Sequence, residues 1–313
     1  MNTNNMSLNE TASAARIERV GMIGLGLMGS AIASQVMKKG FKLSVVGHRS
    51  RQALEELVAQ GATELGSAAE LARNVDVVIV CVTGTPHVRD AVFREDGLLA
   101  GAHDGLIVID STTADADFAA EAASAFAEKG AAFLDAPVNR TPKEAREGRL
   151  NVLVGGDAAV LDRVRPLMAA YGETVHHLGA HGSGYRAKLI HNFIAQANGA
   201  ILAEAFGTAA KAQLDLHEFA AVCRLSGAHS KTFDRLIPYL LEGDDSGQQF
   251  AIRNAAKDMR SYSQLAASYS STAILAEAVR QIYVLGINLG HGDEYVPHMF
   301  DVVAELNGTK QNG

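Results

Sequence analysis

The stretch Val20-Gly21-Met22-Ile23-Gly24-Leu25-Gly26-Leu27-Met28-Gly29 places a glycine-rich turn between a short apolar run and a helical one. It matches G-x-G-x-x-G at a strand-to-helix junction. The first glycine of such a motif permits the tight turn, the second lets backbone approach a pyrophosphate, and the third lets helix pack on strand. The helix N-terminus offers free N–H groups to the phosphates. We therefore predict that Gly24, Leu25, Gly26, Leu27, Met28 and Gly29 bind a dinucleotide; a glycine turn used only for packing is the alternative.

The residues after this turn continue as an alternation of short apolar runs and amphipathic helical stretches. Strand-like runs are Val20–Ile23, Leu43–Val46, Val77–Val82, Leu106–Ile109, Ala132–Leu134, Asn151–Val154 and Thr174–His177. Helical stretches are Leu27–Lys39, Arg51–Gln60, Asp115–Lys129 and Ala158–Ala169. Continuous apolar runs joined by helices are typical of a parallel sheet covered on both faces. The pattern predicts an α/β, Rossmann-type, doubly wound domain.

Strand signals disappear after Gly182. Residues Tyr185–Gln213 contain no proline and carry apolar residues at helical spacing, which predicts one long helix. Further helices are expected near His217–Leu225, Ala251–Ala267, Thr272–Leu285 and Val296–Leu306. We expect a disordered tail over residues 1–16, a dinucleotide-binding domain over 17–181 and an all-helical domain over 182–313, which opens with the long interdomain helix.

The composition narrows the class of protein. A chain of 313 residues favours two domains, and its net charge of −7 gives little support to nucleic-acid or membrane binding. The N-terminal residues lack the apolar core of a signal peptide. With two cysteines, no disulfide framework is implied, Cys81 is interpreted as a buried structural thiol, and a cytoplasmic location is expected. No histidine spacing suits a metal, so no metal site is expected.

The residues after the second strand-like run bear on the choice of nucleotide. Many NAD-binding proteins place Asp or Glu about twenty residues after the glycine turn, but none occurs from Arg19 through Leu54. His48, Arg49, Ser50 and Arg51 stand there instead. Arginine offers bidentate donors to a 2′-phosphate, so we predict NADP (as NADPH) as cofactor. The alternative is a solvated basic turn.

The start of the long helix carries a second candidate site. Lys188 and Asn192 are four residues apart and share one helix face, and His191 lies close to it. Their place at the seam between two domains indicates a ligand cleft. An exposed lysine on a long helix is the alternative. Burial and the nearby Arg186 are expected to lower the pKa of Lys188 towards a catalytically useful value.

Four ordered segments resemble the β-hydroxyacid dehydrogenases, a family that includes 3-hydroxyisobutyrate dehydrogenase and tartronate semialdehyde reductase. They are Gly24–Gly29, Asp135–Val138, Gly182–Asn192 and Lys257–Met259, and the late Gly290–Asp293 is also similar. The resemblance runs from about Arg19 to the end of the chain. It implies a Rossmann-type domain followed by a helical substrate and oligomerisation domain, in a homodimer or homotetramer.

The same resemblance implies the site residues and the reaction. Lys188 would act as general acid/base and Asn192 would place the substrate hydroxyl. Val82, Thr83, Thr112 and Lys257 would contact the cofactor. The expected reaction is hydride transfer between NADPH and a small anionic aldehyde, with Lys188 stabilising the carbonyl oxygen and delivering the proton.

This chain departs from the family pattern after Val138. Asn139, Arg140 and Thr141 replace a Ser-Gly-Gly loop that holds the substrate carboxylate. The Arg-Thr pair resembles the sulfolactaldehyde reductase branch, so a sulfonate, phosphonate or second carboxylate is as well supported as a simple acid. Alternatively, Arg140 points to solvent or pairs with Glu144 or Glu147.

Two further positions differ. His191 replaces a common Asn and is grouped with the substrate residues, and Arg253 replaces a frequent acidic residue.

Two other functions stay open: an imine reductase on the same scaffold, which generally lacks the lysine, and a catalytically silent nucleotide-binding regulator.

Overall fold

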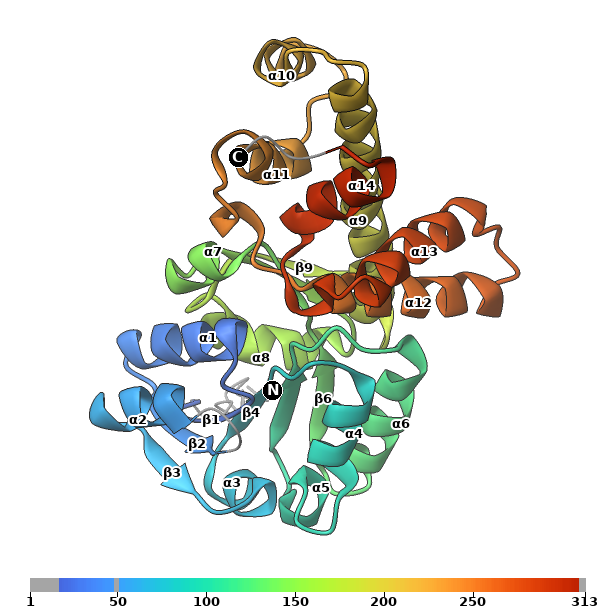
Figure 1. The fold of residues 1–313 in the computed structure, drawn as a ribbon. Helices are drawn as coiled ribbons and strands as arrows, with labels where there is room; N and C mark the ends of the chain where they lie inside the picture. Colours follow the sequence, from blue (N-terminus) through green and yellow to red (C-terminus); the bar gives the residue numbers. More distant parts are fainter. Residues whose placement is uncertain (1–16, 48–50, 310–313) are drawn as a thin grey trace, which may run out of the picture.

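The computed structural model describes residues 17–47 and 51–309, so the expected tail over 1–16 lies outside the described residues. A six-stranded parallel sheet has the order β3-β2-β1-β4-β5-β6, and a smaller sheet has the order β7-β8-β9 (Figure 1). The helical segments that follow lie on one side of the sheets (Figure 1). The predicted doubly wound fold class with a helical second part is confirmed.

The elements of the sheet-bearing part follow in chain order. The strands are β1 Arg19–Ile23, β2 Lys42–Val46, β3 Thr63–Leu65, β4 Val77–Val80, β5 Ile107–Asp110, β6 Ala132–Asp135, β7 Val138–Asn139, β8 Leu150–Val154 and β9 Gly172–His177. The helices are α1 Leu27–Lys38, α2 Arg51–Ala59, α3 Ala68–Asn74, α4 Thr85–Phe93, α5 Leu98–Gly101, α6 Ala116–Ala127, α7 Pro142–Arg146 and α8 Ala158–Met168.

Helices make up the rest of the described chain. They are α9 Ser183–Lys211, α10 Leu216–Arg224, α11 Lys231–Glu242, η1 Ser246–Gln248, α12 Ile252–Ser268, α13 Ile274–Asn288, η2 His291–Asp293, η3 Val296–His298 and α14 Met299–Asn307. None of the helices within the described residues is long and apolar enough to cross a bilayer.

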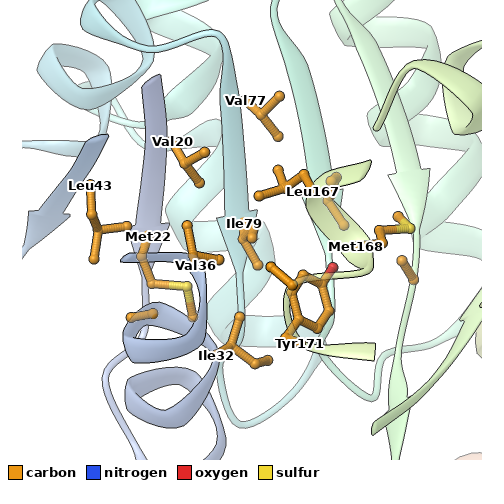
Figure 2. Close-up of a cluster of buried hydrophobic side chains, with 14 of the residues drawn as sticks. Val20, Met22, Ile32, Val36, Leu43, Val77, Ile79, Leu167, Met168 and Tyr171 are labelled. Carbon is orange, nitrogen blue, oxygen red and sulfur yellow. The ribbon is translucent and has the colours of Figure 1, made fainter. Parts of the chain in front are cut away.

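The large sheet is buried on both faces, as the apolar runs predicted. Every residue of β4 and β5 is buried. Helices α1, α2 and α8 cover one face, where Met22, Ile79 and the ring of Tyr171 pack together (Figure 2). Helices α3, α4, α5 and α6 cover the other face around Phe133.

The strand order creates a switch point between β1 and β4. The chain moves outward from β1 to β3 and returns to pair β4 with the other side of β1. Ligands of such sheets bind outside the carboxyl ends of the strands at this point. The glycine turn after β1 and Cys81 after β4 both lie there. Cys81 is thus half-buried beyond the strand, which ends at Val80 and does not extend to Val82 as expected.

The long helix α9 is fixed to the sheet at its first turn. The carboxylate of Asp135, at the end of β6, accepts hydrogen bonds from the backbone N–H groups of Gly182 (2.8 Å) and Tyr185 (3.0 Å). The hydroxyl of Tyr185 donates to Asp110 at the end of β5. From this anchor α9 runs through the middle of the helical part, with α10 at its far end (Figure 1).

The helical part has its own apolar core, which surrounds α9. Phe206, Phe233 and Tyr283 are among its buried side chains. Helix α11 was not expected, although Phe233, Leu236 and Ile237 bury its inner face at helical spacing. Ser230 caps this helix by accepting a hydrogen bond from the N–H of Phe233.

Candidate active site

A cavity of about 720 Å³ lies at the carboxyl edge of the large sheet and reaches the helical part. Its walls come from the turns after β1, β2 and β4, the loop after β7, and helices α9, α11 and α12. The cavity thus occupies the switch point of the sheet and the predicted seam beneath α9.

The glycine turn is built as the motif requires. Gly24 has φ +91°, and a Cβ there would lie 2.1 Å from the Cys81 carbonyl oxygen. A Cβ on Gly29 would lie 1.9 Å from the Gly24 carbonyl oxygen, so only glycine lets α1 pack this closely. A Cβ on Gly26, by contrast, would meet nothing within 4 Å. This open space at the start of α1 fits the close approach of a pyrophosphate.

The residues at the end of β2 are only partly described. His48, Arg49 and Ser50 lie outside the described residues. Arg51 is described, and its Nη1 lies 2.8 Å from Oε1 of Glu64 on β3. That carboxylate also lies beside Gly47, where an added Cβ would be 2.9 Å from it. The sequence up to Leu54 has no acidic residue at this turn, but Glu55 lies 3.8 Å from Arg51, and the fold brings Glu64 closer from the neighbouring strand.

Of the four further residues expected to contact the cofactor, three line the cavity and one does not. Val82 and Thr83 line the cavity, as does Lys257, whose Nζ donates to the Thr83 carbonyl oxygen (2.7 Å). Thr112 is buried behind the wall, where its hydroxyl accepts a hydrogen bond from the N–H of Val82 (3.1 Å). Ser111, which was not expected, lines the cavity beside it.

Lys188 lies on the cavity wall, on the second turn of α9. Its Nζ donates to Oδ1 of Asn139 in the loop after β7 (2.8 Å). Burial lowers the pKa of Lys188 to about 8, while the charge of Asp258 opposes this shift and that of Lys257 adds to it. The expected contribution of Arg186 is wrong, because its guanidinium donates to Ser183 Oγ (2.9 Å) and Lys257 is the nearby cation.

Asn192 lies beside Lys188 and is held from α12. It is buried, and its Nδ2 donates to Oδ2 of Asp258 (2.6 Å). Lys257 Nζ lies 3.1 Å from the other oxygen of this carboxylate. Asp258 therefore fixes the amide group of Asn192 and places a negative charge near Lys188.

His191 also lines the cavity. Its Nδ1 lies 3.2 Å from the Asn192 Oδ1. Burial, followed by the positive charge of Lys188, lowers the pKa of His191, and the charge of Arg235 on α11 adds to this effect. This environment favours the neutral imidazole over the charged form.

The Asn139–Thr141 loop borders the same space. Arg140 has φ +88°, a left-handed conformation that suits the glycine expected at this position. Its guanidinium contacts the carboxylate of Glu173 on β9 and donates to the Arg149 carbonyl oxygen (2.6 Å). Pairing with Glu144 or Glu147 was expected as the alternative and is wrong. The N–H of Thr141 donates to Glu144 Oε2 (3.0 Å) and caps α7.

The helical part supplies wall residues that the sequence analysis did not select. They are Thr232, Arg235, Gln248, Gln249, Phe250 and Asn254. Ser230 followed by apolar residues at helical spacing signalled α11, but no local pattern shows which of its side chains reach a ligand. Arg253 does not line the cavity, because it pairs with Asp293 (2.6 Å) and donates to the Gly292 carbonyl oxygen.

Two family models match successive parts of the chain. Residues 19–179 match the NAD binding domain of 6-phosphogluconate dehydrogenase. Residues 182–302 match the NAD-binding model of NADP-dependent 3-hydroxyisobutyrate dehydrogenase. The first model alone covers half of the chain.

Individual proteins are similar over nearly the whole chain. An NAD-dependent L-serine dehydrogenase of Pseudomonas aeruginosa is 29% identical, over 93% of this chain and 98% of that protein. A 3-sulfolactaldehyde reductase of Escherichia coli is 29% identical, over 87% and 91%. The crystal structure of a 3-hydroxyisobutyrate dehydrogenase from Salmonella typhimurium has a TM-score of 0.83 at 27% identity, over 91% and 99%.

The matches and the site geometry both indicate a nicotinamide dinucleotide site. The models cover both parts of the chain, the glycine turn has the required space, and the similar proteins are dehydrogenases or reductases. The chain therefore belongs to the β-hydroxyacid dehydrogenase family of nicotinamide-dependent oxidoreductases that act on CH–OH groups.

Proposed function

We propose that the protein is an NADPH-dependent dehydrogenase that interconverts a small anionic aldehyde and its hydroxy acid, with Lys188 as general acid/base. The observation that carries this proposal is the lysine itself. It lies on the cavity wall with its Nζ held by Asn139, and its pKa is lowered to about 8. A group with a pKa near the working pH transfers protons efficiently in both directions.

The glycine turn, Val82, Thr83 and Lys257 would hold the dinucleotide, which supplies the hydride when bound. The free space at Gly26 supports this assignment. Arg51, together with Arg49 and Ser50, supports NADPH as the preferred form through contacts with a 2′-phosphate. Glu64 opposes that preference, because it pairs with Arg51.

Lys188 handles the proton at the substrate oxygen. In the reducing direction its ammonium group stabilises the developing negative charge and delivers a proton from Nζ. In the oxidising direction the neutral amine accepts the hydroxyl proton. The amide of Asn192, fixed by Asp258, would orient that hydroxyl. Asn139, Arg140, Thr141 and His191 would border the rest of the substrate.

Lys188 also separates this proposal from the other two functions. Imine reductases on this scaffold generally lack the lysine, and a silent regulator has no need for an oriented Lys188–Asn139 pair.

A direct test is a screen of aldehydes with carboxylate, sulfonate and phosphonate tails, with NADPH and NADH oxidation followed by absorbance. We expect turnover of at least one anionic aldehyde and a preference for NADPH of about ten-fold or more in kcat/KM, which corresponds to ~1.4 kcal/mol. Turnover of cyclic imines with no turnover of any aldehyde would contradict the proposal.

We further propose that the chain acts in the cytoplasm as a homodimer or homotetramer assembled through its helical part. An apolar stripe on α9 supports this assembly: Ile190, Ile194 and Ile201 have 47%, 56% and 54% of their surface exposed. Their spacing places them near one face of the helix, where a second copy of the chain would cover them.

A further inference from the structure

The side chain of Arg235, on α11, lines the cavity and has few polar contacts with the rest of the described chain. Its side chain is two-thirds buried, and among the described residues its one charged neighbour is Glu144, whose Oε1 lies 3.5 Å from Nη2. This separation is longer than the 2.7–2.9 Å typical of charge-assisted hydrogen bonds. No hydrogen bond joins the guanidinium to another part of the described chain. A guanidinium that faces a cavity with free N–H donors can bind an anion there.

Glu144 pairs only partly with Arg235, because its carboxylate also takes part in the cap of α7. Its Oε2 accepts hydrogen bonds from the N–H and hydroxyl of Thr141, which caps α7. These hydrogen bonds lower the pKa of Glu144, and the charge of Arg235 adds to the effect. The carboxylate thus orients Arg235 while leaving most of its donors free.

The guanidinium of Arg140, by contrast, is already paired within the protein. Its guanidinium contacts Glu173 directly and donates to the Arg149 carbonyl oxygen. Its charge is therefore balanced by groups outside the substrate space. The sequence favoured Arg140 as the anion-binding residue, but the structure leaves Arg235 as the less satisfied of the two arginines.

Arg235 also lies at the correct end of the cavity. Its Nη2 lies 3.5 Å from Glu144, and Glu144 accepts a hydrogen bond from Thr141 in the Asn139–Thr141 loop, so Arg235 lies on the substrate side of the cavity and not at the dinucleotide turn. Thr232, three residues earlier on α11, lines the same wall. Together they offer a planar donor fork and a hydroxyl, which suit carboxylate, sulfonate or phosphonate oxygens.

We propose that Arg235, assisted by Thr232, binds the anionic group of the substrate that lies away from the reacting carbon, and so determines the specificity for anionic aldehydes. This inference rests on the proposed function. Because α11 belongs to the helical part, binding of the anion also joins the two parts of the chain around the substrate.

The test compares Arg235→Gln, Arg235→Lys and Arg140→Gly with two substrates of similar length, succinic semialdehyde and the uncharged butanal. Arg235→Gln should raise KM for succinic semialdehyde about ten-fold or more, which corresponds to ~1.4 kcal/mol, with kcat little changed. Its kcat/KM for butanal should stay within about two-fold, because the donor fork has no partner there. Arg235→Lys should recover part of the loss. Arg260→Ala, an exposed arginine on α12 outside the cavity, is the matched control.

A selective loss with Arg140→Gly but not with Arg235→Gln would overturn the inference in favour of Arg140. An equal loss of kcat/KM for both substrates would also overturn it, since it would indicate a general structural effect.

Calorimetric titration of the NADP⁺-saturated protein with sulfoacetate measures anion binding separately from the reaction. If the wild type reduces no aldehyde, the proposed function fails. Weaker sulfoacetate binding in Arg235→Gln alone would still support the anion site, whereas equal or absent binding in wild type and variant would overturn it.

Discussion

At the scale of single residues, Lys188 shows how the fold adjusts an ordinary side chain. Burial disfavours its charged form, whereas Asp258 favours it, and the result is a pKa of about 8. Asn139 accepts a hydrogen bond from one of the three N–H groups of its ammonium. The remaining two donors are sufficient to hold a substrate oxygen and to transfer a proton to it.

Replacing Lys188 with alanine should remove the proton donor and leave the dinucleotide turn intact. We expect kcat to fall by about 10²–10⁴, with NADPH affinity unchanged by fluorescence titration. Lys231→Ala is the control, because that side chain is 92% exposed on α11. If Lys188→Ala retains more than about a tenth of wild-type kcat, the assigned role is wrong.

The pH dependence should follow the same group. Reduction needs protonated Lys188, so the rate should be constant at low pH and fall as pH rises through about 8. Oxidation needs the neutral amine and should rise over the same interval. Asp258→Asn removes the carboxylate that raises the pKa of Lys188, so both midpoints should move to lower pH. Profiles of kcat/KM in both directions measure this, and an unchanged midpoint in Asp258→Asn would exclude this coupling.

Glu64 and Arg51 should oppose each other in cofactor choice. Glu64→Gln removes the carboxylate 2.8 Å from Arg51 Nη1 and so frees the guanidinium for a 2′-phosphate. The ratio of kcat/KM for NADPH over NADH should rise several-fold, on the order of 1 kcal/mol. Arg51→Ala should lower the ratio. Glu55→Gln, 3.8 Å from Arg51 and more exposed, should change it less. If all three variants keep the wild-type ratio, Glu64 and Arg51 do not determine the choice of cofactor.

At the scale of elements, the start of α9 decides where the lysine lies. Lys188 is three residues beyond Tyr185, whose backbone N–H and hydroxyl are held by Asp135 and Asp110. Burial raises the pKa of Asp110 to about 6, so this anchor is costly to bury, and the hydrogen bonds from Thr112 and Tyr185 offset part of that cost. The two carboxylates connect the sheet edge to the helix that carries the lysine.

Asp135→Asn should therefore weaken the anchor. The amide loses the negative charge and places an NH₂ group against one of the two buried N–H donors, which should destabilise the fold by ~2–3 kcal/mol. Asp157→Asn is a matched control, since it caps the shorter α8 at an exposed position and should cost ~1 kcal/mol or less. Urea unfolding measures both variants. Equal small losses would mean that Asp135 does not hold α9.

At the scale of the whole molecule, the apolar core of the sheet, which covers both of its faces, and the core around α9 flank the cavity. The isoleucines on the outer face of α9 belong to neither core. If a second copy covers this face, Ile194→Glu should place a charge in the interface and shift the assembly towards the mass of a single chain. Light scattering after gel filtration measures the mass. The exposed Val222 on α10, changed to Glu, serves as control; a dimer or tetramer that survives Ile194→Glu contradicts the α9 interface.

The sequence determined the features that depend on neighbouring residues. Gly24, Gly26 and Gly29 predicted the strand–turn–helix unit, because Gly24 adopts a positive φ in the turn and Gly29 packs against the Gly24 carbonyl oxygen, both within that unit. Apolar periodicity predicted the sheet and most of the helices. Helical spacing placed Lys188 and Asn192 on one face, and the structure has them both on the cavity wall.

Only the tertiary structure decided which charges meet. Glu64 on β3 reaches Arg51 at the start of α2, Glu173 balances Arg140, and Lys257 replaces Arg186 as the cation near Lys188. These partners are 13, 33 and 69 residues apart, counted from the residue numbers. Arg235 reaches the cavity because α11 packs along α9. No local pattern encodes such pairs, since a side chain's electrostatic partners depend on how distant elements pack, whereas its backbone conformation depends mainly on its neighbours.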